Sequence, residues 1–301
     1  MKNKGIWLGI GAYACWGVLP IFWKAIQDVP AVQIVAHRLA WSLVFLTIVL
    51  TLRSGWSGML SALNRRNLMI YSAAAVLLTL NWLVYIWGVN AGFIVETSLG
   101  YFINPLVSVL LGVIFMRERL SPAKWIPVGL AAIGVIYLTI SYGSLPWISL
   151  ALAFTFGLYG LFKKLSPLGS LNGLTLETGV LFVPAVLYLV YLETQGTGAF
   201  GHIPFWQNVL LALSGVVTAV PLLLFAGAAR SIPLSTVGLL QYIAPTLQFI
   251  LGVFVYNEPF TLEKLVGYAI IWLALLIFSV GGVYERNRHL VAGRQHAVHS
   301  K

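Results

Sequence analysis

Charge is what this sequence has least of. Only 9% of its 301 residues are charged and 59% are hydrophobic, whereas soluble domains carry about 25% charged residues. So few charged side chains cannot cover a surface that faces water, so lipid must surround most of the chain. The composition therefore predicts an integral membrane protein.

Cysteine and the motifs of several enzyme classes are also scarce or missing. Cys15 is the single cysteine, which excludes an intramolecular disulfide and a cysteine-cluster metal site. No set of His, Asp or Glu residues has the spacing of metal ligands, and no Gly-Lys-Ser phosphate loop is present. We therefore expect no cofactor, no metal site and no ATP hydrolysis within this chain.

Long apolar runs make up most of what is present. Each run has about the 20 residues that a bilayer requires. The predicted spans are residues 6–24, 31–52, 68–89, 95–116, 122–141, 145–162, 173–192, 207–229, 234–256 and 262–283. The sequence thus predicts an all-α polytopic protein with ten transmembrane helices.

The basic residues predict how these helices are oriented. If the N-terminus is cytoplasmic, 15 of the 18 Lys and Arg residues fall in cytoplasmic segments. Lys24 and Lys264 fall outside, and Arg38 lies within a span. This distribution follows the positive-inside rule, so the net charge of +10 reflects topology and not a nucleic-acid partner. We expect a cell-membrane protein with both termini in the cytoplasm, and residues 286–301 as a disordered tail.

An internal repeat joins the two halves of the chain. An offset of 140 residues pairs Pro105 with Pro245 and Glu118 with Glu258, among other matches. Such a constant offset across five spans indicates an ancestral duplication. Five is an odd number, so the second copy enters the membrane from the opposite side. We predict two inverted units, residues 1–141 and 142–285, around a central cavity, as in secondary transporters.

Small and polar residues share one helix face in each copy. In the first copy the face holds Ser98, Tyr101, Pro105, Ser108 and Gly112, and the second copy has Gly238, Gln241, Pro245, Gln248 and Gly252. Helix packing explains the glycines, but buried amides and phenols each need a polar partner, which favours a cavity. The candidate cavity residues are Tyr101, Asn104, Ser98, Asn81, Tyr85, Gln241, Tyr242 and Gln248. Pro105 and Pro245 are candidate gating hinges.

Four ionisable residues within or beside the spans are candidates for anchoring charge or for coupling. Arg38 either reaches the outer head groups or anchors an anionic group, on the solute or on Glu96. His37 is either a helix-interface residue or part of a proton relay. Glu177 either belongs to a packed polar cluster or binds a proton or a cationic group. We favour a functional role for Arg38 and Glu177.

Several stretches resemble one known family across residues 5–285. They include Ala36-His37-Arg38, Asn81-Trp82, the run from Glu96 to Leu106, Glu177-Thr178 and the run from Gln241 to Thr246. These stretches are similar to those of the RarD branch of the EamA permeases, in the drug/metabolite transporter superfamily. The resemblance implies ten helices in two inverted repeats, a central cavity and export of small metabolites.

The preferred hypothesis is a secondary active or facilitative transporter of small organic solutes, such as a metabolite, amino acid or drug, that exports by alternating access. A flippase for lipid-linked sugars is an alternative and would need a lateral opening to lipid. A membrane-embedded enzyme is disfavoured, because only His37, Arg38 and Glu96 could supply a reacting group. The expected partners are a small-molecule solute, membrane lipid and protons, in a monomer or homodimer.

Overall fold

A computed structural model gives the fold of the chain. It describes residues 2–53, 55–61, 63–90, 94–142, 147–255 and parts of 262–280. Within these ranges every regular element is a helix, which confirms the all-α prediction.

The helix bounds follow the predicted apolar runs closely. The elements are α1 (Lys2–Lys24), α2 (Ala31–Leu52), α3 (Trp56–Ser61), α4 (Arg65–Asn90), α5 (Ile94–Met116), α6 (Pro122–Tyr142), α7 (Trp147–Leu165), α8 (Ser170–Thr194), α9 (Phe205–Ser231), α10 (Leu234–Leu240), α11 (Ile243–Ile250) and the π-helical turn η1 (Leu251–Val255). Seven of the described helices, α1, α2, α4, α5, α7, α8 and α9, are long and apolar enough to cross a membrane. The ten predicted spans are therefore observed in part. The apolar part of α6 is shorter, the ninth span is interrupted, and much of the tenth lies outside the described residues.

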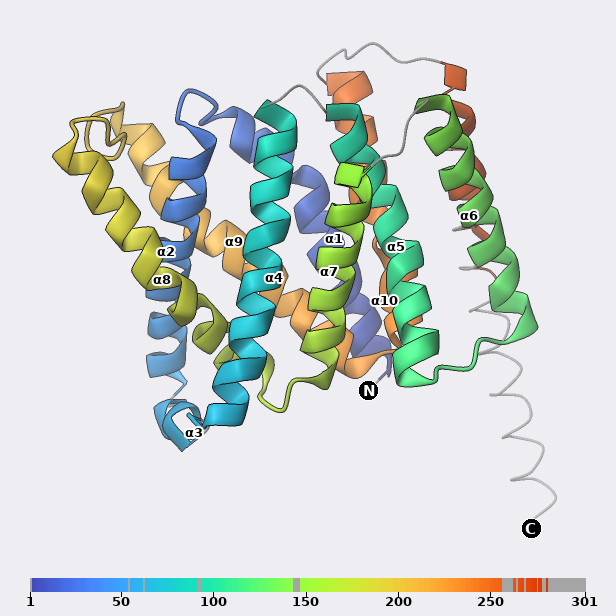
Figure 1. Cartoon of the computed structure of the whole chain (residues 1–301), viewed down its shortest axis with the longest axis horizontal. Helices are drawn as coiled ribbons and strands as arrows, with labels where there is room; N and C mark the ends of the chain where they lie inside the picture. The colour runs from blue at the N-terminus through green and yellow to red at the C-terminus, as the bar shows by residue number, and fades with distance from the viewer. Residues whose placement is uncertain are drawn as a thin grey trace.

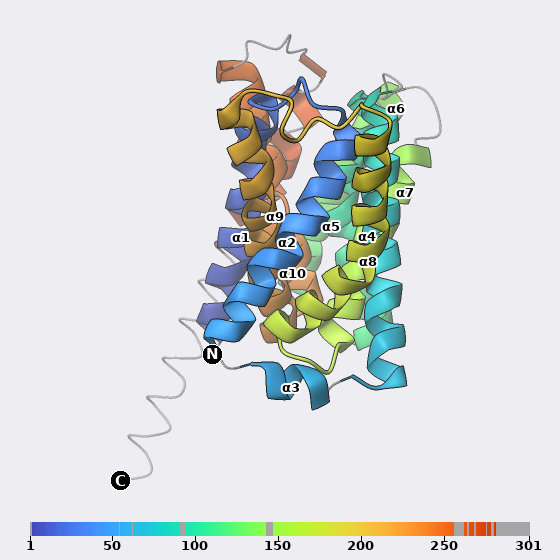
Figure 2. The same ribbon diagram turned by 90° about the vertical axis from the view of Figure 1, so that its left-hand side faces the viewer.

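The long helices form one bundle and run roughly along a common direction (Figure 1). α5 packs against α7 and α10, α1 against α9 and α11, α2 against α8 and α9, and α4 against α7 and α8. α3 lies across the end of the bundle at which α4 begins (Figure 2). We call that end, where α1 begins and α5 ends, the lower end, and the opposite end the upper end.

The two prolines of the polar faces have different local structures. Pro245 removes the N–H that would bond to the carbonyl of Gln241, and its ring clashes with that carbonyl. The helix is interrupted there, between α10 and α11, and Ala244 N bonds to Gln241 O at 3.2 Å in a tighter turn. α5 in contrast continues without interruption through Pro105. The break replaces the continuous ninth span that the hydropathy predicts.

The lower end of α5 is fastened to the start of α10. Arg117 has a positive φ of 53°, which turns the chain after α5. The Glu118 carboxylate then accepts hydrogen bonds from Leu234 N at 2.6 Å, Ser235 N at 3.0 Å and Ser235 Oγ at 2.7 Å. A carboxylate at a helix N-terminus is favoured by the free N–H groups and the helix dipole. This contact makes α5 and α10 antiparallel neighbours.

Five aromatic rings form the centre of the core. They belong to Tyr13, Trp16, Phe156, Tyr159 and Phe225, with ring centroids 5.4 to 6.3 Å apart in contacting pairs. Such edge and offset contacts suit the ring quadrupoles and bury large apolar areas. We call these five residues the aromatic cluster.

Candidate solute cavity

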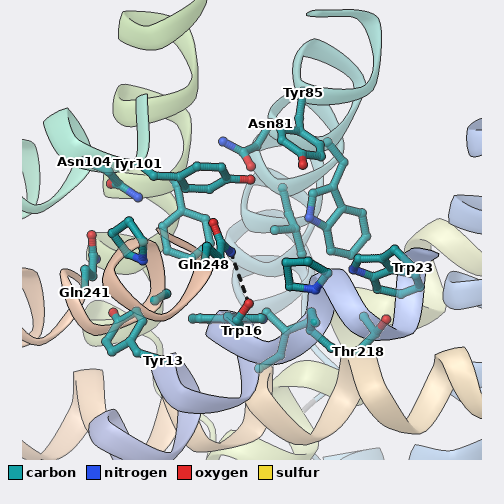
Figure 3. Close-up of a pocket in the computed structure, with 18 of the residues that line it drawn as sticks. Tyr13, Trp16, Trp23, Asn81, Tyr85, Tyr101, Asn104, Thr218, Gln241 and Gln248 are labelled. Carbon is teal, nitrogen blue, oxygen red and sulfur yellow. Dashed lines mark hydrogen bonds between the residues drawn. The ribbon is translucent and has the colours of Figure 1, made fainter. Parts of the chain in front are cut away.

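A cavity of about 190 Å³ lies between α1, α2, α4, α5, α7, α9 and the α10–α11 break. Its wall combines indole rings with hydroxyl and amide groups (Figure 3), and Arg38 adds a guanidinium group. The polar and aromatic lining residues are Tyr13, Trp16, Trp23, Arg38, Asn81, Trp82, Tyr85, Tyr101, Asn104, Thr218, Gln241 and Gln248. The aromatic cluster contributes Tyr13, Trp16 and Phe156 to the wall, and its other members, Tyr159 and Phe225, lie on the parts of α7 and α9 nearer the lower end.

Arg38 is the cation of the cavity. Its Nε donates a hydrogen bond to Thr218 Oγ1 at 2.8 Å, and its guanidinium carbon lies 4.6 Å from the ring centroids of both Trp23 and Trp82. Cation–π contacts of this kind hold a guanidinium without neutralising it. Among the residues that the structure describes, no carboxylate forms an ion pair with Arg38. The geometry therefore leaves this charge available to an anionic group.

Three polar groups on the cavity wall have no hydrogen-bond partner. They are the Tyr13 hydroxyl, Asn104 Oδ1 and Gln241 Oε1, which are buried and have no partner of standard geometry within the described part of the chain, although the Tyr13 and Gln241 side chains face each other. A buried polar group without a partner costs about 1–3 kcal/mol. Asn104, Gln241 and Tyr13 lie together on the side of the cavity opposite Thr218 and Trp23 (Figure 3). The cavity thus presents a cation at one side and hydrogen-bond acceptors at the other.

The amide side chains of the wall are held by contacts between helices. Asn81 Nδ2 donates to Leu152 O and to Thr155 Oγ1, both at 2.9 Å. Gln241 Nε2 donates to Ser108 Oγ at 3.1 Å, and Gln248 Nε2 donates to Trp16 O at 3.2 Å (Figure 3). Each amide nitrogen donates at least one hydrogen bond to a neighbouring helix, and these bonds orient the amide oxygens of the wall.

The structure brings together most of the predicted cavity residues. Tyr101, Asn104, Asn81, Tyr85, Gln241, Gln248, Arg38 and Pro245 all line the cavity. The two polar faces also pack on each other, since an added Cβ at Gly238 would lie 2.7 Å from Pro105 O. Part of each face therefore lines the cavity, as at Tyr101 and Gln241, and another part packs helix against helix, as at Gly238 and Pro105.

Other predicted residues lie elsewhere. Tyr242 is fully buried and donates to Phe102 O at 3.2 Å, away from the cavity lining. His37 is buried with its ring centroid 5.2 Å from that of Phe200, beside a separate groove. Pro105 is buried in α5 outside the lining. The side chains of Glu96 and Ser98 lie outside the described part of the structure.

Glu177 and Lys163 correct one expectation. The charge count treats Lys163 as a cytoplasmic surface charge, but its side chain is only 3% exposed and bonds to Glu177, which is 1% exposed. Lys163 lies in α7, and its Nζ is 5.4 Å from the Tyr159 ring centroid. The pair lies outside the cavity lining.

Sequence reasoning missed Tyr13, Trp23 and Thr218 as lining residues. One signal could have found Thr218. The offset of 140 pairs it with Leu78, which also lines the cavity. Tyr13 and Trp23 follow apolar positions of the first span, and nothing in their neighbourhood distinguishes a cavity residue from a packed one.

Comparisons with known proteins agree on one family. The model of the EamA-like transporter family matches residues 3–140. The chain is 46% identical to Protein RarD of Streptomyces exfoliatus, over 92% of this chain and 89% of that protein. It is 45% identical to the uncharacterized transporter YojE of Bacillus subtilis, over 93% of this chain and 95% of that protein. A crystal structure with 15% identity covers 92% of this chain and 97% of its own with a TM-score of 0.68, a likeness in fold alone.

Proposed function

The chain belongs to the EamA-like transporter family, among relatives named RarD, and on this premise we propose that it carries a small zwitterionic solute across the membrane by alternating access. Export is the direction that the family resemblance leads us to expect. The proposal depends on one observation: within the described part of the chain, the guanidinium of Arg38 has no carboxylate partner, and it lies opposite the buried amide oxygens of Asn104 and Gln241.

The charge pattern of the cavity favours a zwitterion. A carboxylate can bond to the terminal nitrogens of Arg38, because only its Nε is used by Thr218 and guanidinium binds carboxylate in a bidentate fork. An ammonium group has three donors and no acceptor, which suits the oxygens of Asn104 and Gln241 and the hydroxyl of Tyr13. The Trp23 and Trp82 rings leave room for an apolar body between the two ends.

The volume of the cavity limits the size of the solute. Typical ligand pockets measure roughly 300–1,000 Å³, whereas this cavity measures about 190 Å³. An amino acid or a metabolite of similar size fits this space better than a lipid-linked sugar.

The helix bounds support the inverted repeat that alternating access requires. α4 begins at Arg65 and α9 at Phe205, while α5 begins at Ile94 and α10 at Leu234. Both intervals equal the offset of 140 found in the sequence. The family match to residues 3–140 likewise agrees with a first unit over residues 1–141 and a second over 142–285.

The pattern of helix contacts supports the same symmetry. An exchange of halves converts α1 into α7, α2 into α8, α4 into α9, and α5 into α10 with α11. Under this exchange the α1–α9 contact becomes α7–α4, and the α2–α9 contact becomes α8–α4. The α5–α7 contact becomes the contact of α1 with α10 and α11. All of these helix pairs are in contact. The contacts α2–α8 and α5–α10 convert into themselves. This is the pattern expected for a pseudo-two-fold axis in the membrane plane.

The cavity straddles this axis. Five pairs of its lining residues are separated by 140 positions: Trp16 and Phe156, Leu78 and Thr218, Trp82 and Leu222, Tyr101 and Gln241, Asn104 and Ala244. We propose that both termini are cytoplasmic, as the basic residues predict, which makes the upper end external. The aromatic cluster then separates the cavity from the cytoplasm, as expected of an outward-facing state.

The proposal is tested by solute exchange in proteoliposomes. The probes are radiolabelled leucine and phenylalanine. The competitor is either the unlabelled amino acid or its amide, which keeps the side chain and the ammonium but lacks the carboxylate. An Arg–carboxylate contact contributes about 1.5–3 kcal/mol, so Arg38→Gln should weaken competition by the acid roughly tenfold to a hundredfold and leave competition by the amide almost unchanged.

Arg53→Gln is the matched control, because Arg53 is exposed at the C-terminal end of the same helix. The zwitterion proposal is wrong if the wild type binds acid and amide equally, or if both arginine variants behave alike. Movement of a lipid-linked sugar with no exchange of soluble solutes would instead establish a flippase.

A further inference from the structure

A buried ion pair lies beneath the cavity, outside its lining. Lys163 of α7 bonds to Oε2 of Glu177 of α8, and both side chains are almost completely buried. The Lys163 Nζ lies 5.7 Å from the Tyr71 ring centroid and 5.4 Å from that of Tyr159. The second carboxylate oxygen, Glu177 Oε1, and the Tyr159 hydroxyl are both buried and face each other at hydrogen-bonding range, and neither has another partner among the described residues. We call Lys163 and Glu177 the buried pair.

Glu177 borders a small void that shares a wall with the solute cavity. The void measures about 10 Å³, roughly the space that holds one water molecule, so it excludes any organic solute. Four residues line both spaces: Leu78, Trp82, Thr218 and Leu222. Thr218 is also the residue to which Arg38 donates its hydrogen bond. One side chain therefore contacts the solute-binding cation on one side and the void of Glu177 on the other.

The shared wall lies on the proposed symmetry axis. Its four residues form two pairs at the offset of 140, Leu78 with Thr218 and Trp82 with Leu222. The same offset relates Trp23, beside Arg38, to Lys163 of the buried pair. In a transporter that alternates by exchanging the shapes of its halves, the space around Glu177 opens toward the lower end when the space around Arg38 closes.

From this arrangement we propose that Glu177 is a proton-binding site that couples transport to the proton gradient, an inference that rests on the proposed alternating access. The proton adds to Oε1 of Glu177, the oxygen that does not bond to Lys163, and converts the carboxylate into a carboxylic acid. Lys163 keeps its ammonium, so the net charge of the buried pair changes from zero to plus one. The ligand is a proton delivered by water, and no other reactant is needed.

Protonation of the buried pair has a structural consequence. An ammonium that loses its buried counterion is strongly destabilised in a low-dielectric interior. Lys163 lies two residues before the end of α7 at Leu165, near the lower end, where a modest opening brings it to water. Protonation therefore favours the state that opens at the lower end, and loss of the proton favours the observed state.

The other ionisable groups around the pair do not provide a second counterion. On α4 the Tyr71 hydroxyl accepts a bond from Leu168 N at 3.1 Å, and on α7 Tyr159 lies beside the pair. On α9 Arg230 donates to the carbonyls of Ser166 and Leu168, and on α2 Arg38 faces the solute cavity. Glu177 is the one ionisable residue on the wall of the void within the described part of the chain.

The experiment measures which end of the protein is open, without any solute. A cysteine replaces Leu19, an uncharged lining residue of α1, in a Cys15→Ala background, and a membrane-impermeant maleimide is added outside oriented proteoliposomes. Labelling is divided by that of a cysteine at exposed Gln195, which corrects for the pH dependence of the thiol reaction. Between about pH 8 and about pH 5.5, the ratio should fall about fivefold or more as the lower-open state becomes populated.

Variants of the buried pair give opposite predictions. Glu177→Gln mimics the protonated acid and should show low, pH-independent labelling. The double variant Lys163→Met with Glu177→Gln removes both charges and should show high, pH-independent labelling. Glu193→Gln is the control on the same helix, since Glu193 is exposed, and it should retain the response of the background. The proposal is overturned if Glu177→Gln keeps the normal pH response, or if the background shows none.

Solute exchange separates this inference from the proposed function. With phenylalanine as the probe, Glu177→Gln should retain exchange at equal pH but lose accumulation driven by a pH difference. Absence of exchange in the wild type would contradict the proposed function alone, while labelling would still report the proton site. Equal loss of exchange and accumulation in Glu177→Gln, with a well-folded protein, would contradict the coupling role.

Discussion

Gly112 offers a sharp test of the contact that fastens α5 to α10. An added Cβ at this position would lie 2.8 Å from Glu118 Oε2 and 3.1 Å from Ser235 N. Gly112→Ala must therefore displace the carboxylate oxygen that accepts from Ser235 N and Ser235 Oγ. Gly129 provides the matched control, because a Cβ there would meet nothing within 4 Å.

Two opposing contributions determine the expected change in the free energy of unfolding. Hydrogen bonds to a charged acceptor contribute about 1.5–3 kcal/mol each, and weakening the two bonds to Ser235 should cost about 3 kcal/mol. Helix propensity returns about 1 kcal/mol on replacing glycine by alanine. Gly112→Ala should thus lower the free energy of unfolding by about 2 kcal/mol, and Gly129→Ala should raise it by up to about 1 kcal/mol.

Unfolding by SDS in mixed micelles measures both variants, and a double-mutant cycle with Glu118→Gln identifies the cause. If Gly112→Ala acts through the carboxylate, its cost should shrink by at least about 1 kcal/mol in the Glu118→Gln background, because contacting residues are not additive. Equal costs of Gly112→Ala in both backgrounds would refute the assigned contact. So would equal effects of Gly112→Ala and Gly129→Ala.

Three further predictions follow from contacts elsewhere in the bundle. Gly215→Ala places its Cβ against the backbone of α2 and should destabilise the protein by about 2 kcal/mol or more, whereas Gly179→Ala, with no neighbouring atom, should not; SDS unfolding measures both. Tyr242→Phe removes the donor to Phe102 O and should cost about 1 kcal/mol of stability without changing solute exchange, since this residue does not line the cavity. Trp82→Leu removes one of the two rings that flank the cavity guanidinium and should weaken competition by carboxylate solutes about threefold to tenfold; unaltered competition would contradict the cation–π contact.

Much of the fold could be predicted because hydropathy and the internal repeat each indicate where the helices begin and end. The starts of α5 and α10 differ by the predicted offset, and α6 begins at Pro122, where the predicted span 122–141 begins. The break between α10 and α11 could not be predicted. Pro105 and Pro245 occupy equivalent positions, yet only the second interrupts its helix. Which proline breaks a helix depends on the neighbours that satisfy the freed carbonyl, and a single sequence does not reveal those neighbours.

The site was predictable where residue type and helical spacing agreed. Tyr101 and Gln241 are polar residues on the predicted small and polar face of an apolar span, and both line the cavity. Tyr242 follows Gln241 directly, but successive residues point about 100° apart on a helix, and packing decides which one faces the cavity. Lys163 was missed for a similar reason. It precedes Lys164 at a helix end, where basic residues are typical of the cytoplasmic boundary, and only the position of α8 reveals its burial.

The two predicted repeats have similar helix arrangements but different charged residues at equivalent positions. This difference bears on how solute and proton binding could be coupled. Trp23 and Lys163 are equivalent by the offset, as are His37 and Glu177. The α1–α2 junction of the first copy holds Arg38 against an indole ring, with no carboxylate partner among the residues that the structure describes, whereas the α7–α8 junction of the second pairs its cation with Glu177. A ligand shifts a conformational equilibrium only through a difference in its affinity for the two states. Identical junctions would present the same groups to each side in turn and could not assign different ligands to the two states. In the proposed mechanism, divergence at these few positions would allow a solute to select one state of the bundle and a proton the other.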